Sequence, residues 1–151
     1  KTDTQDSQGK VIEETNIESM DIEDIKKALD NFKGEIEQIP PMVSAIKYKG
    51  KKLYQLARSG KTIKREPRKI TISGIEILDF KFPELTFRVR CSKGTYVRTL
   101  CEDIGKSLGV PSHMSSLVRS ASGDFLLKDS KNLDDVNEKD IISYSSYNRH
   151  I

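Results

Sequence analysis

The chain has 151 residues, 35% of them hydrophobic and 32% charged, a balance typical of a soluble globular protein with one modest core. No apolar run approaches the roughly 20 residues that cross a bilayer, and the polar first residues do not resemble a signal sequence, so we expect a cytoplasmic protein without a membrane partner. Cys91, Cys101 and the two histidines lack the spacing of a zinc site. We therefore expect no metal, no disulfide scaffold, and both cysteines as small core residues.

The net charge of +3 conceals an uneven distribution of charge along the chain. Residues 40–69 contain ten basic residues and one acidic residue, a net charge of +9, whereas the rest has 16 basic and 22 acidic residues, a net charge of −6. A block of one sign in an otherwise acidic chain is typical of a protein that binds a polyanion, although a charge run can also be a solvated face. The distribution favours a nucleic acid as partner.

The start of the chain predicts a loop followed by a helix. Residues 1–9 are rich in turn-forming side chains and predict a loop entered from an earlier part of a domain. Asp21 can cap a helix over about 22–32, in which apolar residues recur at helical spacing, and Gly34 follows the helix end.

The basic block follows this helix and departs from regular structure. Pro40 and Pro41 prevent a continuing helix, and a short helix is predicted near 51–59, closed by Gly60. Insertions of this length in compact domains tend to be functional or disordered, and the block has enough apolar residues for partial order. We interpret it as a binding loop.

Two strands are predicted next. Isoleucines alternate over 70–77 on each side of Ser73 and Gly74, where the phase slips by one residue, which predicts a β-bulge. After a turn around Pro83, apolar residues alternate with polar ones over 85–91, as in a half-buried strand antiparallel to the first.

The last third of the chain predicts one strong element and two weak ones. A helix is expected over about 95–108, with its apolar residues on one face. Residues 114–121 could form a further strand. Beyond Phe125 the chain is polar and acidic, and a weak helix after Asn132 is possible.

The junction between the second strand and this helix, residues 92–98, is the best candidate site on residue chemistry alone. Gly94 allows a ligand to approach the backbone, a helix N-terminus favours anions, and Arg98 is expected about one turn inside the helix. The plainer alternative is that Arg98 is a surface cation in an ordinary ion pair and Tyr96 is half-buried packing. Asp103 is expected on a different helix face from Arg98, in a structural rather than catalytic role.

Four blocks of the sequence resemble the TruB family of pseudouridine synthases. The longest are Cys91-Ser92-Lys93-Gly94-Thr95-Tyr96-Val97-Arg98-Thr99-Leu100 with Asp103-Ile104-Gly105 and Leu108-Gly109, and Ile39-Pro40-Pro41-Met42-Val43-Ser44-Ala45-Ile46-Lys47 with Gly50-Lys51-Lys52-Leu53-Tyr54, Ala57-Arg58 and Gly60. The shorter ones are Thr2, Thr4, Asp6 and Gly9, and His113, Leu117 and Arg119. Because the blocks occur in family order over about residues 2–125, chance agreement is a poor explanation.

The resemblance implies an enzyme that isomerises one uridine in the T-arm of tRNA to pseudouridine, with neither a metal nor an organic cofactor. In the family an aspartate attacks a flipped-out nucleotide, and Arg98 matches the arginine that pairs with this aspartate. Leu117 matches an apolar residue packed against the bound base, and Tyr96 and Lys93 belong to the same motif as Arg98 and are expected to contact the substrate. The chain is expected to be a fragment without the family's upstream nucleophile block and its C-terminal RNA-binding domain, and to be inactive alone.

The basic block matches the family's thumb-like insertion, expected here over residues 38–69, which folds over the T-loop. Its cations would contact phosphates, whereas selectivity would come from loop shape and stacked bases. One departure is that Val118 and Ser120 flank Arg119, where the family more often has an Arg-Arg pair. The residues expected to contact RNA are Lys47, Lys49, Lys51, Lys52, Arg58, Lys64, Arg65, Arg68 and Arg119.

The resemblance also implies an α+β fold, part of the pseudouridine synthase fold, with a mixed, largely antiparallel sheet and packed helices. Residues 1–125 would belong to the catalytic domain and residues 126–151 to a polar tail or the start of the C-terminal region. A sheet that lacks strands would expose an edge and apolar surface, so we expect self-association through that edge or association with the missing piece.

Two alternatives stay open. The chain could be a non-catalytic module that grips structured RNA through the same insertion, as an RNA chaperone would. The related guide-RNA-dependent synthases of archaea and eukaryotes are disfavoured because they lack the thumb-like insertion.

Overall fold

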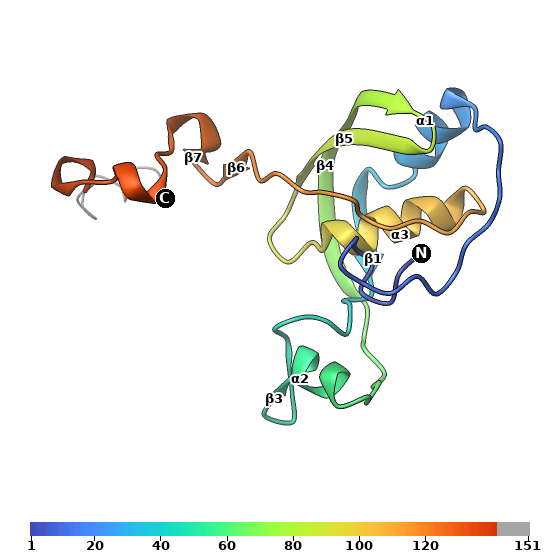
Figure 1. Ribbon diagram of the computed structural model, residues 1–151, viewed down its shortest axis with the longest axis horizontal. Coiled ribbons are helices and arrows are strands. Elements are labelled where there is room, and N and C mark those ends of the chain that lie inside the picture. Colours follow the sequence, from blue (N-terminus) through green and yellow to red (C-terminus); the bar gives the residue numbers. More distant parts are fainter. Residues whose placement is uncertain (142–151) are drawn as a thin grey trace. The chain divides into compact units, whose positions relative to one another are not determined.

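The computed structural model describes residues 1–141, which fall into two compact units, Lys1–Ser116 and a second unit that begins at Leu117 (Figure 1). The first unit contains a three-stranded sheet, two helices on one face of it, and the thumb-like insertion. The α+β class and the largely antiparallel sheet predicted from the sequence are confirmed. None of the helices in residues 1–141 has the length and apolar character that crossing a membrane requires.

The sheet has the strand order β1-β4-β5, and both strand pairs are antiparallel. The register shifts between Ile72 and Gly74, which confirms the predicted bulge. β1 was not predicted, because only Gln38 in it is buried and only Ile36 is half-buried, so no alternation of apolar residues marks this strand. The strands are β1 (Gly34–Gln38), β4 (Arg68–Lys81) and β5 (Glu84–Cys91).

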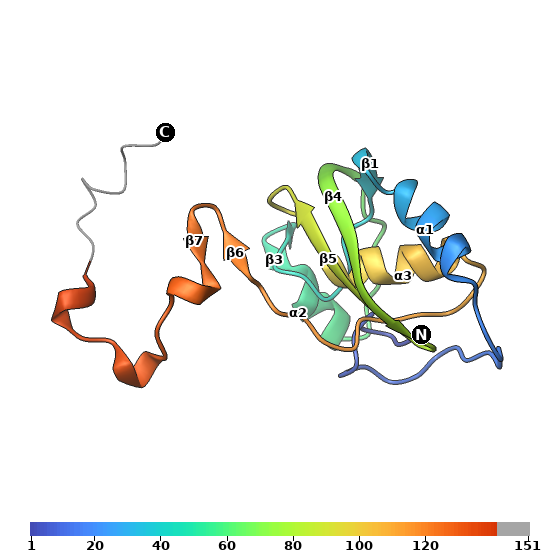
Figure 2. The ribbon, with the colours of Figure 1, turned by 90° about the horizontal axis from the view of Figure 1, so that it is seen from above.

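Two helices, α1 (Ile22–Asp30) and α3 (Val97–Ser107), pack on one face of this sheet (Figure 2). Both were predicted with ends within two residues of these, and Asp21 caps α1 by accepting a hydrogen bond from the backbone N–H of Glu23. Each buried aliphatic side chain contributes about 1.5–3 kcal/mol to holding the helices on the sheet. The core between them consists of Ile25, Leu29, Ile70, Ile72, Leu100 and Ile104.

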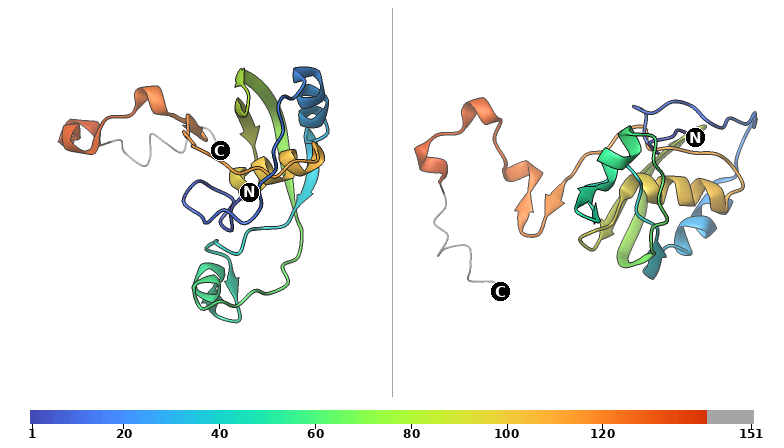
Figure 3. Two further views of the ribbon diagram at one scale, coloured as in Figure 1. Left: turned by 45° about the vertical axis from the view of Figure 1, so that its right-hand side comes forward. Right: turned by 90° about the horizontal axis from the view of Figure 1, so that it is seen from below.

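The thumb-like insertion leaves the sheet after β1 and returns at β4, so its two ends lie side by side (Figures 1 and 3). It contains β2 (Lys47–Tyr48), β3 (Lys51–Lys52) and α2 (Leu53–Arg58). The short helix predicted near 51–59 is therefore confirmed. Leu53, the first residue of α2, is only 2% exposed and is the buried side chain of this helix.

In its described part, residues 117–141, the second unit contains only two-residue strands and single turns of 3-10 helix. The strand predicted over 114–121 is wrong: Met114 forms one isolated bridge with Asp6, Ala121 pairs with Leu126 in a two-residue strand, and no strand in the described residues pairs with residues 115–120 between them. In place of the weak helix expected after Asn132 the structure has two separate 3-10 turns. From residue 142 onward, the polar tail expected over 126–151 lies outside the described residues. The elements are β6 (Ala121–Ser122), β7 (Phe125–Leu126), η1 (Leu127–Asp129), η2 (Leu133–Asp135) and η3 (Glu138–Asp140).

The two cysteines differ in environment. Cys91 is exposed, so the expectation of a core residue is wrong for it; it is the last residue of β5, which is an edge strand of the sheet. Cys101 is half-buried on α3, where burial raises the pKa of its thiol to about 11. A thiol with a pKa this high is protonated at neutral pH and therefore a poor nucleophile.

Candidate functional site

The junction between β5 and α3 is shaped by a tight turn. The backbone N–H of Ser92 donates to the Thr71 carbonyl (2.8 Å), and the Ser92 Oγ accepts from the Thr71 N–H (3.0 Å), so the end of β5 is fixed to β4. Gly94 then adopts a φ of 86°, a backbone conformation that is unfavourable for residues with a side chain. Tyr96 is the N-cap of α3, which places Arg98 at the second helical position rather than about one turn inside, as the sequence suggested.

The guanidinium of Arg98 joins three segments that are distant in the sequence. Its Nη1 donates to the Asp6 carboxylate at 3.0 Å, and its Nη2 donates to the Val43 carbonyl at 2.5 Å. The side chains of Arg98 and Asp6 are only 22% and 18% exposed. Because the pair is largely withdrawn from water, it is oriented more firmly than an exposed ion pair. Arg98 therefore does form an ion pair, as the plainer alternative expected, but the pair is half-buried rather than on the open surface.

The loop that presents Asp6 explains the threonine-rich block of the sequence. Thr4 Oγ1 donates to one carboxylate oxygen of Asp6 (2.7 Å), and the Gln8 backbone N–H donates to the same oxygen (3.1 Å), which leaves the other oxygen for Arg98. Thr2 Oγ1 donates to the Asp6 carbonyl (2.6 Å). A side chain at Gly9 would collide with Thr4, because an added Cβ would lie 2.2 Å from its hydroxyl oxygen.

Electrostatics hold the Asp6 carboxylate ionised. Partial burial raises the pKa of this carboxyl. Hydrogen bonds from Thr4, Gln8 and Arg98, together with the positive charge of Arg98, lower the pKa by more than burial raises it. The net result is a pKa below the ordinary value of 3.8. At neutral pH the site therefore contains a fixed anion against a fixed cation.

Arg98 keeps donors for a further ligand. A guanidinium has five N–H donors. Among the described residues it makes two hydrogen bonds, to Asp6 and to Val43. The remaining donors suit the planar oxygens of a second carboxylate or of a phosphate.

The other residues predicted to contact the substrate lie in two places. Tyr96 is half-buried and Lys93 is exposed, both in the segment that leads to Arg98. Leu117, 53% exposed, and Arg119 belong to the second unit. Their assignment to substrate stays a prediction.

Nearly all the cations predicted to contact RNA lie on the surface of the first unit, within the thumb-like insertion. Arg65 differs, because it is half-buried at the base of the insertion, with its Nη1 donating to the Pro40 carbonyl at 3.4 Å. The exposed ones are Lys47, Lys49, Lys51, Lys52, Arg58, Lys64 and Arg68.

The aromatic residues of the insertion lie beneath some of these cations. Lys52 Nζ is 5.7 Å and Arg58 Cζ is 5.4 Å from the centroid of the Tyr54 ring, and Lys49 Nζ is 5.6 Å from that of Tyr48. Rings held this way position the charges. Tyr54 is half-buried, so its ring packs at least partly within the insertion.

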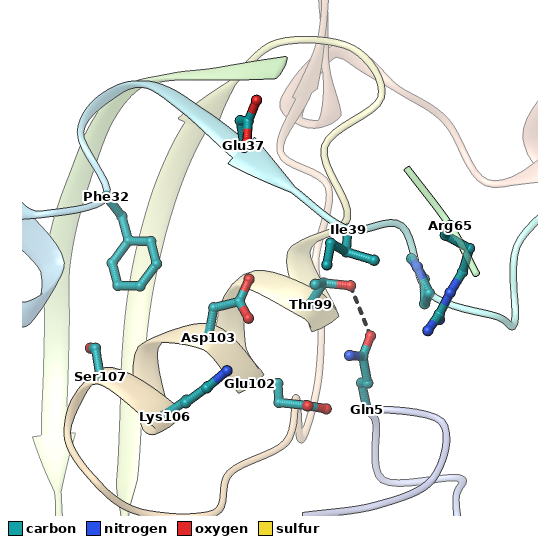
Figure 4. A pocket seen from close by; sticks show the side chains of 11 residues that line it. Gln5, Phe32, Glu37, Ile39, Arg65, Thr99, Glu102, Asp103, Lys106 and Ser107 are labelled. Carbon is teal, nitrogen blue, oxygen red and sulfur yellow. Dashed lines mark hydrogen bonds between the residues drawn. The ribbon is translucent and has the colours of Figure 1, made fainter. Parts of the chain in front are cut away.

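A hollow of about 640 Å³ lies between β1, α3 and the base of the insertion (Figure 4). Arg98 does not line it; Gln5 and Thr99 do, and they are joined by a hydrogen bond from Thr99 Oγ1 to Gln5 Oε1 (2.8 Å). The Asp103 carboxylate faces this hollow, and burial together with the charge of Glu102 raises its pKa above the ordinary value. Asp103 is thus separate from the Arg98 pair, as the sequence predicted.

Sequence reasoning missed Asp6 as the partner of Arg98. Asp6 lies in a block that resembles the family, but nothing in its spacing indicates a contact with a residue 92 positions away.

No group of three or more His, Cys, Asp or Glu side chains in residues 1–141 is arranged to hold a metal ion.

Two family models match the chain. Residues 1–97 match the N-terminal domain of the TruB family pseudouridylate synthases. Residues 98–148 match the tRNA pseudouridylate synthase B C-terminal domain.

Curated relatives and a solved structure agree with these matches. The chain is 49% identical over 140 residues to the tRNA pseudouridine synthase B of Clostridium tetani (strain Massachusetts / E88), covering 93% of this chain and 48% of the relative. It is also 49% identical over 144 residues to that of Staphylococcus aureus (strain JH9), covering 91% and 47%. The chain therefore spans about half the length of these relatives. A chain in the crystal structure of a Cbf5-Nop10-Gar1 complex matches with a TM-score of 0.50 and 33% identity, covering 65% of this chain and 25% of that one.

Proposed function

We propose that this chain, which belongs to the TruB family of pseudouridylate synthases, works as part of a tRNA pseudouridine synthase that isomerises a uridine in the T-arm of tRNA. The observation that carries the proposal is the half-buried Arg98–Asp6 pair at the start of α3, where Arg98 lies inside the most specific of the family-like blocks. The relatives bear the name of this activity, and each is about twice as long as the part that this chain matches.

In this proposal Arg98 holds the aspartate that attacks the nucleotide in place and favours its ionised form. That aspartate is proposed to lie in the part of the full-length protein that this chain does not span. The free donors of Arg98 support the role, because a guanidinium can hold two carboxylates on different N–H groups. Asp6 keeps the guanidinium from turning away, while the second carboxylate is aimed at the flipped-out nucleotide.

The thumb-like insertion is the proposed contact with tRNA. Its exposed cations, listed above, would neutralise phosphates, and the Tyr54 ring would hold Lys52 and Arg58 in place. Tyr96, Lys93 and Leu117 are proposed to contact the uridine itself, and Arg119 a phosphate.

Two further proposals concern assembly and location. β5 is an edge strand of the sheet among the described residues, so the isolated chain is proposed to associate through this edge with a second copy or with the remaining part of the enzyme. The cytoplasm, where tRNA is modified, is the proposed location.

Release of tritium from tRNA labelled at uridine carbon 5 tests the proposal, because isomerisation displaces this hydrogen. We expect the full-length protein that contains this chain to release tritium, and Arg98→Ala in it to abolish release. The isolated chain is expected to bind a T-arm stem-loop without release. Binding without release by the full-length protein would instead favour a non-catalytic RNA-binding module.

A further inference from the structure

Gln38 is a buried polar residue in a strand that is otherwise exposed or half-buried. It is the last residue of β1, is 2% exposed, and pairs in the sheet with Arg68. Burying an uncompensated amide costs free energy, so a buried glutamine needs specific partners. Gln38 has them, and they lie on another element, 58 residues away.

The side chain of Gln38 clamps the backbone of Tyr96. Its Oε1 accepts a hydrogen bond from the Tyr96 N–H at 2.8 Å, and its Nε2 donates to the Tyr96 carbonyl at 3.2 Å. The reverse orientation of the amide would set donor against donor and acceptor against acceptor, so the contacts define its orientation. One side chain therefore fixes both polar groups of a single residue.

The clamped residue is the N-cap of α3, and Arg98 follows two residues later. The Tyr96 carbonyl also accepts the helical hydrogen bond from the Leu100 N–H (3.0 Å), and Leu100 is fully buried in the core. The Tyr96 side chain makes no capping hydrogen bond, so the clamp by Gln38 contributes directly to the position of this helix start. A shift of the first turn would carry Arg98 with it.

The same short segment also holds the tip of Arg98. Five residues after Gln38, the Val43 carbonyl accepts the hydrogen bond from Arg98 Nη2. Residues 38–43 thus contact the first turn of α3 twice, once through its backbone and once through the guanidinium. Gln38 also stands where the thumb-like insertion leaves the sheet, opposite Arg68, where the insertion returns.

We propose that Gln38 is a positioning residue of the reaction: its amide fixes the first turn of α3 and thereby aims the Arg98 guanidinium. The inference rests on the proposed function for its catalytic meaning. Gln38 itself contacts neither Arg98 nor Asp6 through its hydrogen bonds, which go to Tyr96. Misplacing a reacting group by about 1 Å can cost about 100-fold in rate, so loss of the clamp affects turnover more than substrate binding.

The test replaces Gln38 with methionine, which has similar length and no hydrogen-bonding amide, in the full-length protein. We expect kcat for tritium release to fall by about 10- to 100-fold. KM for tRNA is expected to stay within about twofold, because the cations of the insertion are untouched. A change in KM alone, or an unchanged kcat, overturns the proposal.

Ser112→Ala is the matched control for a purely structural effect. Ser112 Oγ donates to the Cys101 carbonyl of α3 (2.8 Å), so this variant also removes a side-chain hydrogen bond to the backbone of the same helix, three residues beyond Arg98. Both variants should lower the melting temperature, but only Gln38→Met should lower kcat. Equal loss of kcat in both variants overturns the proposal.

A second measurement needs no turnover. Because Arg98 helps to lower the pKa of the Asp6 carboxyl, a displaced guanidinium raises that pKa, which NMR of the carboxyl carbon follows. We expect a higher Asp6 pKa in Gln38→Met and no change in Ser112→Ala; an unchanged pKa in Gln38→Met overturns the proposal. If the wild type releases no tritium, the proposed function has failed, and this titration still decides the role of Gln38.

A third variant covers the case in which Gln38→Met does not fold. Gln38→Asn keeps the amide and sets it back by one methylene, and we expect the same direction of change in kcat and in the Asp6 pKa. Wild-type values for both in a folded Gln38→Asn overturn the proposal.

Discussion

The Arg98 site and the thumb-like insertion both carry charge, but they hold it differently. Arg98 and Asp6 are mostly buried; Arg98 is fixed by two distant partners, Asp6 and Val43, and Asp6 by Arg98 together with its own loop neighbours Thr4 and Gln8. The cations of the insertion are mostly exposed, and three of them, Lys49, Lys52 and Arg58, lie over aromatic rings. A site that depends on geometry is sensitive to single atoms, whereas a surface that depends on summed charge tolerates change at each position.

The largest expected effect is on stability, from a substitution in the hydrophobic core that holds α3, and with it Arg98, on the sheet. Leu100 is fully buried between α3 and the sheet, so Leu100→Ala should lower the free energy of unfolding by about 3 kcal/mol. Urea denaturation followed by circular dichroism measures this. Leu78→Ala, at a position 48% exposed on β4, is the control and should change it by less than about 1 kcal/mol.

The geometric character of the site is tested by a change that keeps its charge. Arg98→Lys retains a cation but loses the planar fork that reaches Asp6 and Val43 together, so we expect kcat of the full-length enzyme to fall by about 100-fold. Single-turnover tritium release measures this, with tRNA affinity unchanged. Wild-type turnover in Arg98→Lys would show that charge alone is sufficient.

The insertion should respond gradually and in a salt-dependent way. Lys47→Ala combined with Lys51→Ala removes two exposed cations, so we expect tRNA affinity to fall about tenfold and the slope of log affinity against log salt to decrease by about 2. Binding titrations at several salt concentrations measure both. Lys26→Ala on α1 removes an exposed lysine outside the insertion and should leave both quantities unchanged.

The stability that the Asp6 carboxyl contributes to the folded chain depends on pH. Its pKa is lowered in the folded chain, so it contributes stability above the ordinary value of 3.8, and this stability is lost as the pH falls through the lower folded value. Asp6→Asn should therefore cost about 1 kcal/mol at pH 7 and flatten the acid limb of the stability curve. Urea denaturation between pH 2 and pH 7, at roughly one-unit steps, detects this. An equally steep acid limb in the variant would contradict the assignment.

The smallest expected effect is a gain in stability at Asp103, opposite in sign to the loss expected at Asp6. The pKa of Asp103 is raised, so its ionised form is disfavoured in the folded chain, and the penalty develops as the pH rises through the ordinary value. Asp103→Asn should raise the melting temperature slightly at neutral pH and leave it unchanged in strong acid. Thermal unfolding at both pH values measures this, and a lower melting temperature at neutral pH would mean that the carboxylate has a stabilising partner.

Periodic elements were predictable because their signals are local. Asp21 and the apolar spacing after it define α1, and the slip at Ser73 and Gly74 marks the bulge in β4. The strand expected over 114–121 failed because a strand needs a neighbour as well as a suitable composition. β1 was missed for the converse reason: it is a strand because β4 pairs with it, not because its own residues alternate.

The sequence by itself determined the helices of the core, the basic insertion, Arg98 as the candidate site residue and the family, because each is encoded in contiguous or regularly spaced residues. Only the tertiary structure decided that Asp6 pairs with Arg98, that Val43 accepts from the same guanidinium, and that Gln38 clamps Tyr96. These contacts join residues 55 to 92 positions apart. No local pattern specifies such pairs, because the packing of the sheet and α3 brings them together.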